Sequence, residues 1–485
     1  MKIVPTRENY DELQRAGYIV PVYQTLFADT MTPILALRKL KEAGKSCFLL
    51  ESVEGGKHWN RYSFLGVDSK FTLSMRDGIL TYEEAGKKKQ VDMETKQYIT
   101  SYLAEYQFAD TSELPPFIGG FVGYFSYDYV KYSYMLEKLF EQDSDVADME
   151  LAFYETIIAF DHLKQTIICL SIGSKSLKTY DAVVEQIGIL TNLLQDSQHP
   201  KKYAGELISE FTGIFSKERY LQMVEDAQHY IREGDIFQVV LANRFEAKYQ
   251  GDLLPTYRQL RMSNPSPYMF YLDFGSYQIT GASPETLIAL KGDILSTFPI
   301  AGTCKRGATD GEDKELVAAL LANPKEVAEH NMLVDLGRND IGKVSRFGSV
   351  MVEDYLKVLQ FSHVSHITSK VIGVLASDFT QLDALEAIMP AGTLSGAPKK
   401  RALEIIAELE GQNRGMYGGA LGYIDIRGNM DMCIAIRMAV KVGDLVSVSA
   451  GAGIVLDSIP ENEFAESHHK ALAMFEALKL AKEVD

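Results

Sequence analysis

Apolar side chains recur at helical spacing in several segments of this chain. The clearest segment is residues 217–233, where they return every three or four positions between a serine N-cap, Ser216, and a glycine stop, Gly234. Similar signals, with proline or glycine near the ends, predict helices over residues 33–43, 323–336, 395–411 and from about residue 460.

Short apolar or alternating runs between these segments predict strands. They cover residues 46–51, 70–75, 117–125, 236–246, 268–274, 277–280, 419–426, 432–440 and 445–450. The runs at 268–274 and 277–280 form a predicted hairpin around Gly275-Ser276. Helices and hairpins mix without strict strand–helix–strand alternation, so we expect an α+β fold.

One stretch of the chain lacks either pattern. Residues 195–210 are polar and aperiodic, so we place a domain boundary there. The predicted division is an N-terminal domain of residues 1–205 and a second domain of residues 206–485.

Charge and cysteine content narrow the possible partners. The 49 basic and 66 acidic side chains give a formal charge of −17, which opposes binding to nucleic acid or to anionic lipid. An anionic substrate would need a local basic group or a bound cation. The four cysteines lie far apart, no apolar signal core begins the chain and no stretch is apolar enough to span a membrane. We therefore expect a cytoplasmic protein.

Two pairs of glutamates are candidates for binding that cation. Glu326 and Glu329 are three residues apart, as are Glu463 and Glu466, and this spacing places both carboxylates of a pair on one helical face. If the two faces met, four carboxylates would converge in a way that suits Mg²⁺. Each pair alone is equally typical of a solvated helix face, and spacing does not show that the helices meet.

Glycine-rich segments and two isolated polar residues are further candidates. Residues 299–303, 393–399 and 450–453 could bring backbone close to a ligand or could simply be turns. Arg437, within an apolar strand-like run, suits a carboxylate ligand or a structural ion pair. His366 could carry protons or could be a core histidine. Cys304 and Ser395 show no histidine–acid partners, so we discount covalent catalysis by them.

Across most of its length the chain resembles the chorismate-utilising enzymes, and among them the large subunits of anthranilate synthase. The motifs that carry the resemblance occur in order between about Leu49 and Lys470. They are Leu49–Ser52, Arg61–Gly66, Gly234–Gln238, Asn264–Met269, Pro299–Thr303, Leu333–Leu336 and Gly451–Val455. The resemblance implies a large α+β assembly of orthogonally packed, mainly antiparallel sheets flanked by helices.

The resemblance also implies roles for individual residues. Glu329 and Glu466 correspond to direct Mg²⁺ ligands, and Glu326 and Glu463 to ligands acting through water. Positions that match the family's chorismate contacts are Gly302, Thr303, Tyr417, Arg437, Gly451, Ala452 and Gly453, with Thr393 in the same pocket. Glu285 corresponds to the general acid that helps the ring hydroxyl to leave, and His366 to the active-site histidine, which we assign to pyruvate elimination.

Two positions separate this chain from relatives with other products. Enzymes that add water to chorismate carry lysine where this chain has Gln238, and glutamine cannot act as that base. Many aminodeoxychorismate synthases carry lysine where this chain has Ala301. Both differences favour anthranilate as the product, although aminodeoxychorismate synthase remains the alternative. A tryptophan-binding protein without catalytic activity is disfavoured, because the residues expected at the metal-binding and substrate-binding positions are all present.

The family resemblance also implies feedback inhibition by tryptophan and assembly with a second subunit. Residues that resemble the family's tryptophan site are Glu51, Ser52, Pro267, Tyr268, Met269, Tyr423 and Cys433. The alternatives are that residues 264–269 are only a proline-rich turn, or that they bind tryptophan without feedback. No Cys–His–Glu glutaminase is recognisable in the chain, so the resemblance implies that ammonia comes from a separate glutamine amidotransferase subunit.

Overall fold

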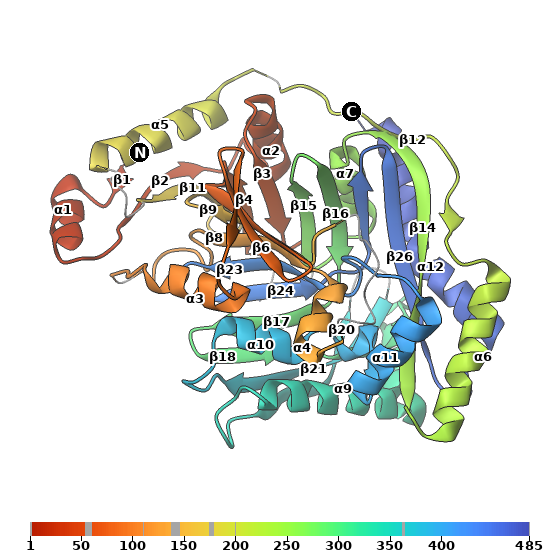
Figure 1. The fold of residues 1–485 in the computed structure, drawn as a ribbon. Helices are drawn as coiled ribbons and strands as arrows, with labels where there is room; N and C mark the ends of the chain where they lie inside the picture. Colours follow the sequence, from red (N-terminus) through yellow and green to blue (C-terminus); the bar gives the residue numbers. More distant parts are fainter. Residues whose placement is uncertain are drawn as a thin grey trace.

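Two large sheets form the body of the molecule. The computed structural model describes residues 2–53, 61–109, 111–136, 146–173, 179–198, 200–360 and 364–484. Within these ranges every pair of neighbouring strands in the two sheets is antiparallel. Strands such as β14 and β26 run steeply across those of the lower sheet, such as β17 and β21, in Figure 1, so the sheets cross nearly orthogonally. The expected α+β architecture is confirmed.

The first sheet has 14 strands among the described residues. In spatial order they are β1 (Ile3–Val4), β2 (Pro21–Phe27), β11 (Thr166–Ile172), β10 (Thr156–Asp161), β4 (Tyr62–Val67), β3 (Cys47–Glu51), β15 (Tyr268–Asp273), β16 (Tyr277–Ser283), β25 (Met438–Val442), β26 (Leu445–Ile454), β14 (Gln238–Gly251) and β12 (Gly205–Leu207). Two short strands, β13 (Thr212–Gly213) and β22 (Gly396–Ala397), also pair with β14.

The second sheet has 12 strands in the same described ranges. Its order is β19 (Ile300–Lys305), β21 (Val364–Val374), β18 (Ile294–Thr297), β17 (Thr286–Lys291), β24 (Met430–Ile434), β23 (Ala420–Asp425), β8 (Gly120–Phe125), β9 (Met149–Tyr154), β5 (Phe71–Arg76), β6 (Ile79–Glu84) and β7 (Lys87–Val91), with β20 (Met351–Gln360) paired to β21.

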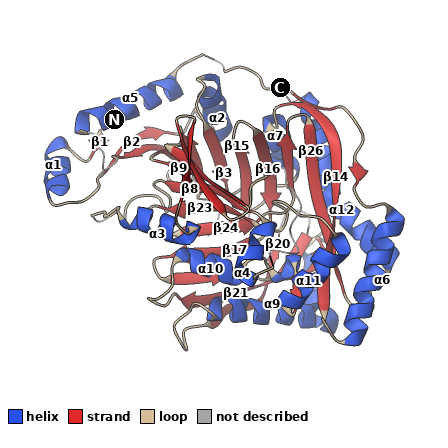
Figure 2. Ribbon diagram, viewed as in Figure 1, coloured by secondary structure: helices blue, strands red, loops and turns tan. Residues whose placement is uncertain are grey.

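Helices surround the sheets, as Figure 2 shows. Their bounds are α1 (Arg7–Arg15), α2 (Pro33–Glu42), α3 (Thr95–Ala104), α4 (Val130–Tyr134), α5 (Tyr180–Gln195), α6 (Lys217–Glu233), α7 (Leu254–Ser263), α8 (Asp310–Ala322), α9 (Pro324–Gly342), α10 (Gln381–Ile388), α11 (Lys399–Glu410) and α12 (Pro460–Leu480). Short 3₁₀ turns span Tyr127–Tyr129, Gly392–Leu394 and Ala481–Glu483. No helix in the described ranges is long and apolar enough to cross a bilayer.

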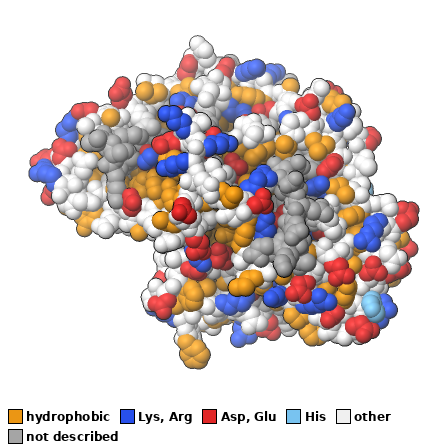
Figure 3. Space-filling view, viewed as in Figure 1, with side chains coloured by type: hydrophobic (Ala, Val, Ile, Leu, Met, Phe, Trp, Pro, Cys, Tyr) orange, Lys and Arg blue, Asp and Glu red, His pale blue; other side chains and the backbone are white. Residues whose placement is uncertain are grey.

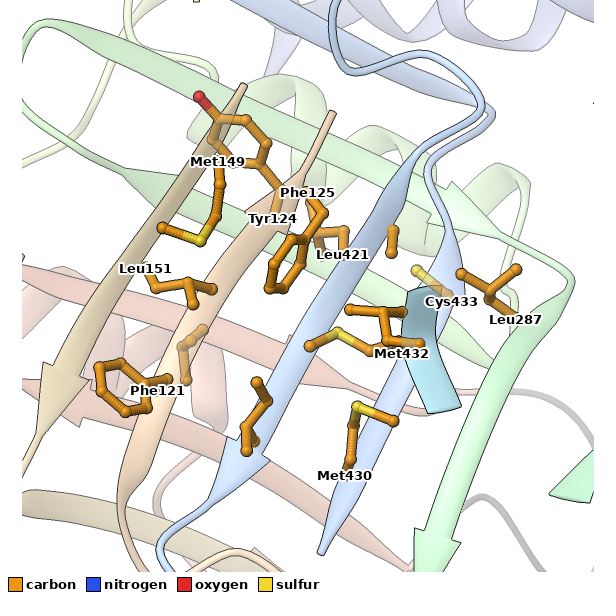
Figure 4. Close-up of a cluster of buried hydrophobic side chains, with 14 of the residues drawn as sticks. Phe121, Tyr124, Phe125, Met149, Leu151, Leu287, Leu421, Met430, Met432 and Cys433 are labelled. Carbon is orange, nitrogen blue, oxygen red and sulfur yellow. The ribbon is translucent and has the colours of Figure 1, made fainter. Parts of the chain in front are cut away.

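The main core lies between the two sheets. Phe48 and Phe270 of the first sheet share one buried cluster with Leu421 and Met432 of the second. Figure 4 shows the part of this cluster contributed by β8, β9, β17, β23 and β24. Burial of these large side chains is the main source of stability for such a core.

The strands of both sequence halves share both sheets. In the first sheet β3 pairs with β15 (Met269 opposite Glu51), and in the second β8 pairs with β23. The division at residue 205 therefore lies between segments that pair directly with each other. That residues 1–205 and 206–485 have separate functions remains a prediction.

Most predicted elements are present, and their ends follow the expected caps. Helix α6 begins after the Ser216 cap, whose hydroxyl accepts from the Arg219 N–H, and ends at Gly234 with φ 85°. Helix α9 begins after Asn323 as predicted but extends to Gly342 rather than to residue 336. Its interior Gly337 lets Thr297 and Pro299 pack closely, since a Cβ there would lie 3.2 Å from Thr297 Cγ2.

Three local predictions are wrong. Residues 395–411 are not one helix: Gly396–Ala397 form β22 and α11 starts at Lys399. The glycine-rich segment 450–453 is not a turn after the strand predicted at 445–450 but lies within β26 (Leu445–Ile454). Residues 432–440 are not one strand, because the chain leaves the second sheet after β24 and enters the first at β25. Arg437 lies in this crossing with φ 52°, not inside a strand.

Candidate active site

A cavity of about 1090 Å³ lies where the chain passes between the two sheets. Two of these crossings line it: the Pro284–Glu285 step from β16 to β17, and the step at Arg437 from β24 to β25. The remaining walls come from β14, β19, β21, β26, α9, α12, the Gly392–Leu394 turn and the loop that carries Tyr417. Residues far apart in the sequence therefore meet here because of the sheet topology.

The four predicted metal-binding glutamates all line this cavity. Glu326 and Glu329 come from α9, and Glu463 and Glu466 from α12. Burial raises the pKa of Glu329, and the nearby carboxylates of Glu326 and Glu466 raise it further. Burial likewise raises the pKa of Glu463, with Glu466 adding to it. The two glutamate-bearing helix faces therefore line one cavity.

These carboxylates provide the right donor chemistry for a hard cation. Hard divalent cations prefer carboxylate oxygens, and mutual repulsion among the carboxylates would be relieved by a positive charge. Within the described residues, no three carboxylate, thiol or imidazole groups already converge closely enough to hold an ion. Glu466 is instead paired with Lys470, 2.7 Å away. The donor set fits Mg²⁺, and these side chains would have to reorient to bind it.

Arg437 presents a positive charge to the same cavity. Burial lowers its pKa, and only Tyr417 acts in the opposite direction. In the described part of the chain no carboxylate forms an ion pair with it within 4.0 Å. A half-buried guanidinium without an acidic partner is well suited to bind an anionic ligand.

Glu285 and Thr393 are joined by a side-chain hydrogen bond in the cavity wall. The Thr393 hydroxyl donates to Glu285 Oε1 (3.3 Å). Burial raises the pKa of Glu285 to about 7, although the Thr393 hydrogen bond and Lys470 lower it. A carboxyl group with a pKa near neutrality can hold and release a proton at working pH, which a surface glutamate cannot.

His366 faces the cavity beside Thr303. The two residues are opposite one another on β21 and β19, and Thr303 Oγ1 lies 3.0 Å from His366 Nδ1. The Gly302 carbonyl lies 3.2 Å from the same nitrogen. Burial lowers the pKa of His366, and Arg437 lowers it further, against the effect of the Gly302 carbonyl. His366 is therefore a neutral imidazole near pH 7.

The glycines at the site have different reasons for being glycine. Gly302 is at a β-bulge in β19 with φ 71°, where a Cβ would lie 3.2 Å from Glu326 Oε2. A Cβ at Gly451 would instead meet the Leu241 carbonyl of β14 at 2.4 Å, so strand pairing requires this glycine. A Cβ at Gly453 would lie 2.8 Å from Gln238 Nε2. Ala452, predicted among the substrate positions, does not line the cavity, because it is buried in a separate core cluster.

Gly302→Ala is expected to cost about 1–2 kcal/mol of unfolding free energy, because a non-glycine residue is strained at positive φ. It should also raise KM for the substrate, because the new methyl group displaces Glu326. Gly443→Ala is a matched control: its φ is 58°, but its Cβ position has no neighbour within 4 Å. Urea unfolding and initial rates should show similar destabilisation in both variants and a changed KM only in Gly302→Ala. An unchanged KM in Gly302→Ala would show that the absence of a side chain at Gly302 is not needed to keep Glu326 in place for substrate binding.

Two basic residues of the site were not predicted from the sequence. Lys470 lines the cavity, pairs with Glu466 and donates to the Gly451 carbonyl (3.1 Å). Lys325 also lines it, next to Glu326. The i,i+4 spacing of Glu466 and Lys470 was a visible signal, but such pairs are common on exposed helices.

The residues predicted to bind tryptophan lie where β3 and β15 run side by side. Glu51 is opposite Met269, and the Val53 N–H donates to the Ser266 carbonyl (3.2 Å). From the other sheet, β23 supplies Tyr423 and β24 supplies Cys433. Pro267 is buried beside them. The structure thus brings all seven residues to one junction between the sheets.

Their side chains lie on two faces of this junction. Glu51 points away from the second sheet, where its carboxylate pairs with Arg261 (3.0 Å), and Met269 lies in the core on that same side. The opposite face holds Tyr268, whose hydroxyl donates to Asp431 Oδ1 (2.8 Å). Ser52 Oγ is buried without a hydrogen-bond partner in the described residues. An unpaired buried hydroxyl is unfavourable unless a ligand satisfies it.

The sequence and fold match a known enzyme family. Residues 47–476 match the chorismate binding enzymes, and the chain belongs to this family. The chain is also similar to the menaquinone-specific isochorismate synthase MenF from Escherichia coli, with a TM-score of 0.70 over 97% of this chain and 98% of that one. At 17% identity this second likeness concerns the fold alone.

Within the family the chain belongs with the anthranilate synthase component 1 proteins. It is 41% identical to that protein from Acetivibrio thermocellus, over 99% of both chains. It is 42% identical to that from Thermus thermophilus, over 96% of this chain and 99% of the relative. The crystal structure of anthranilate synthase component I from Streptococcus pneumoniae is 37% identical, with a TM-score of 0.77 over 93% of this chain and 98% of that one. The resemblance inferred from the sequence motifs is confirmed.

Proposed function

We propose that this chain aminates chorismate with ammonia and eliminates pyruvate, giving anthranilate, the first step of tryptophan biosynthesis. The observation that carries the proposal is one cavity lined by four glutamates on two helices, an arginine that pairs with no carboxylate in the described ranges and a carboxyl group of pKa about 7. Chorismate has two carboxylates and a ring hydroxyl, so each of these features has a matching group on the substrate.

Two positive centres would orient the substrate. Arg437 suits the pyruvyl carboxylate, because a guanidinium can hold a carboxylate through two hydrogen bonds. Tyr417, buried beside it, and the backbone near Gly451 close the pocket around this end. Glu329 and Glu466 would hold Mg²⁺ directly, with Glu326 and Glu463 behind them. When bound, Mg²⁺ would fix the ring carboxylate and withdraw charge from the ring.

Glu285 would supply the proton for the first step. Ammonia adds to the ring carbon beside the carboxylate-bearing carbon, the ring double bonds shift, and the hydroxyl leaves as water with the Glu285 proton. Thr393 holds that carboxyl group in place through its hydrogen bond. The ammonium formed then loses one proton to leave a neutral amine.

The second step restores an aromatic ring. The carbon that received the amine loses its proton, and the enolpyruvyl group departs with the electron pair of the C–O bond as the enolate of pyruvate, which is protonated on its methylene carbon to give pyruvate. His366 is assigned to this step, because a neutral imidazole can accept and return a proton. Thr303 and the Gly302 carbonyl hold its ring.

Gln238 and Ala301 define which nucleophile the site favours. Both residues line the cavity. An amide side chain cannot act as a base toward water, and alanine cannot form a covalent adduct, so ammonia is the proposed nucleophile. It would come from a glutamine amidotransferase subunit, in keeping with relatives that are named as component 1. The four cysteines are free thiols, which suits a cytoplasmic enzyme.

Tryptophan is the proposed inhibitor, bound near Ser52 and Tyr268. The backbone connects this junction to the cavity by short paths: Tyr268 pairs with Ser283, two residues before Glu285, and the Ile434 N–H donates to the Glu285 carbonyl (3.0 Å). A ligand that shifted these strands would displace Glu285 and Arg437. Two distinct sites joined through such elements can couple binding to activity.

The test is an assay with chorismate, Mg²⁺ and ammonium, in which anthranilate fluorescence and pyruvate are measured together. Equal amounts of both products are expected, with a decrease as tryptophan is added, and no product from glutamine without ammonium. Aminated product without pyruvate would instead indicate aminodeoxychorismate, and isochorismate would show that water is the nucleophile. Either result would refute the proposal.

Arg437→Gln is expected to raise KM for chorismate roughly 10- to 100-fold, because charge-assisted hydrogen bonds contribute about 1.5–3 kcal/mol. Arg338→Gln, at an exposed arginine of α9 that pairs with Asp335 and does not line the cavity, removes the same charge and serves as the control. Initial rates across a chorismate series give both constants. A KM for Arg437→Gln equal to that of Arg338→Gln would rule out this contact.

A further inference from the structure

Arg414 is a buried arginine directly behind the cavity wall. Its side chain is only 3% exposed and it does not line the cavity. It pairs with Glu410, also buried, through Nε (2.8 Å to Oε2) and through Nη2 to the other carboxylate oxygen. Its guanidinium also lies over the Tyr127 ring, 4.5 Å from the centroid.

The remaining donors of Arg414 bind two walls of the cavity. Nη1 donates to the Leu394 carbonyl (2.8 Å), in the turn that carries Thr393, and Nη2 donates to the Val240 carbonyl on β14 (2.7 Å). Leu394 and Val240 both line the cavity. One guanidinium therefore joins the Thr393 turn to β14.

Glu410 adds a further contact to the same strand. Its Oε1 accepts the Ala242 N–H (2.9 Å), so the pair satisfies one carbonyl and one amide of β14 in the manner of a neighbouring strand. The backbone of Arg414 is also held, because its N–H and that of Gly415 donate to Asp128 (3.1 and 2.8 Å). Tyr417, on a third wall, is three residues further along the chain.

We propose that Arg414, together with Glu410, is a positioning unit that fixes Thr393 and through it the hydrogen bond to Glu285. The inference rests on the proposed function, since it assigns Glu285 a proton to deliver. Buried ion pairs add little to stability compared with apolar packing, so stability alone does not account for this one. A planar fork is required because four hydrogen bonds leave it in fixed directions, which a lysine cannot reproduce.

Arg414→Lys tests this role. We expect kcat to fall roughly 10- to 100-fold, as small misplacements of catalytic groups commonly cause, with KM for chorismate nearly unchanged. The alkaline limb of the kcat–pH profile should move to higher pH, because the Thr393 hydrogen bond holds down the pKa of Glu285. The charged group that lowers the pKa of Glu285 is Lys470 of α12, and Arg414→Lys leaves Lys470 unchanged.

Arg427→Lys is the matched control. Arg427 also pairs with a buried carboxylate, Asp425 (2.7 Å), and donates to backbone carbonyls, but at the β23–β24 turn, and neither residue lines the cavity. Arg427→Lys should lower the melting temperature about as much as Arg414→Lys does, without a change in the kcat–pH profile. A lower melting temperature in both variants with no displaced limb in Arg414→Lys overturns the proposal.

A double-variant cycle identifies the route of the effect. In a Thr393→Val background, where the hydrogen bond to Glu285 is already absent, Arg414→Lys should not displace the limb further. A full additional displacement would show that Arg414 does not act through Thr393. If Arg414→Lys does not accumulate as folded protein, Glu410→Gln should show a smaller displacement in the same direction, and none would overturn the proposal.

The wild-type chain in the same assay separates the two hypotheses. Wild-type protein that makes no anthranilate refutes the proposed function. Active wild type together with variants that behave like Arg427→Lys refutes only the positioning role.

Discussion

Glu329→Gln and Glu466→Gln should each lower kcat about 1000-fold at saturating chorismate and moderate Mg²⁺. Charge stabilisation by a bound metal contributes several kcal/mol to the transition state, and each 1.36 kcal/mol is a factor of ten in rate. Glutamine keeps the size of the side chain but removes the charge that would hold the proposed cation. Half-maximal activity should therefore also require much more Mg²⁺. Steady-state rates across a Mg²⁺ series measure both effects.

Glu461→Gln is the control for that pair. Glu461 is exposed in the first turn of α12 and does not line the cavity, so its variant loses one negative charge without changing the site. It should match the wild type in kcat and in Mg²⁺ requirement. If Glu329→Gln or Glu466→Gln behaved like Glu461→Gln, these glutamates would not be metal ligands.

Glu285→Gln should lower kcat by about 100- to 10,000-fold, the usual range for loss of a general acid. The amide still accepts the Thr393 hydrogen bond, so the shape of the site is kept while the transferable proton is lost. In the wild type, activity that depends on protonated Glu285 should persist below pH 7 and decline as the pH rises through the pKa of about 7. That decline should be absent from the residual rate of the variant.

Glu150 provides a buried carboxyl group for comparison. Burial raises its pKa too, and Tyr277 donates to it (2.6 Å), but it lies outside the catalytic cavity. Glu150→Gln should leave the pH profile of kcat unchanged. A wild-type profile that is flat across pH 7, or that moves in Glu150→Gln as much as in Glu285→Gln, would refute general acid catalysis by Glu285.

Local signals in the sequence were sufficient where they act over a few residues. Ser216 and Gly234 defined α6 at both ends, because a cap depends on backbone groups within the same turn. Local signals gave a wrong prediction around Arg437, where a continuous apolar run looks like one strand but belongs to two sheets. The apolar residues of both segments pack in the protein interior, and an apolar pattern does not show which sheet each segment joins.

The site depended still more on long-range packing. Spacing placed Glu326 with Glu329 and Glu463 with Glu466, but only the packing of α9 and α12 around one cavity brings the pairs together. The family resemblance supplied that link. Lys470 and Arg414 were missed because their importance comes from contacts with residues far away in the sequence or on other elements.

The overall surface charge does not attract an anionic substrate. Basic and acidic side chains are interspersed over the face drawn in Figure 3, and the chain as a whole carries −17. The local positive charges of the cavity, from Arg437, Lys470 and Lys325, must therefore act at short range.

Whether one cation joins α9 to α12 can be observed directly with Mn²⁺ in place of Mg²⁺. We expect crystals grown with Mn²⁺ to show a single anomalous peak in the cavity, about 2.0–2.3 Å from carboxylate oxygens of both Glu329 and Glu466. No peak there, or a peak bound to only one of the two helices, would contradict the proposed site.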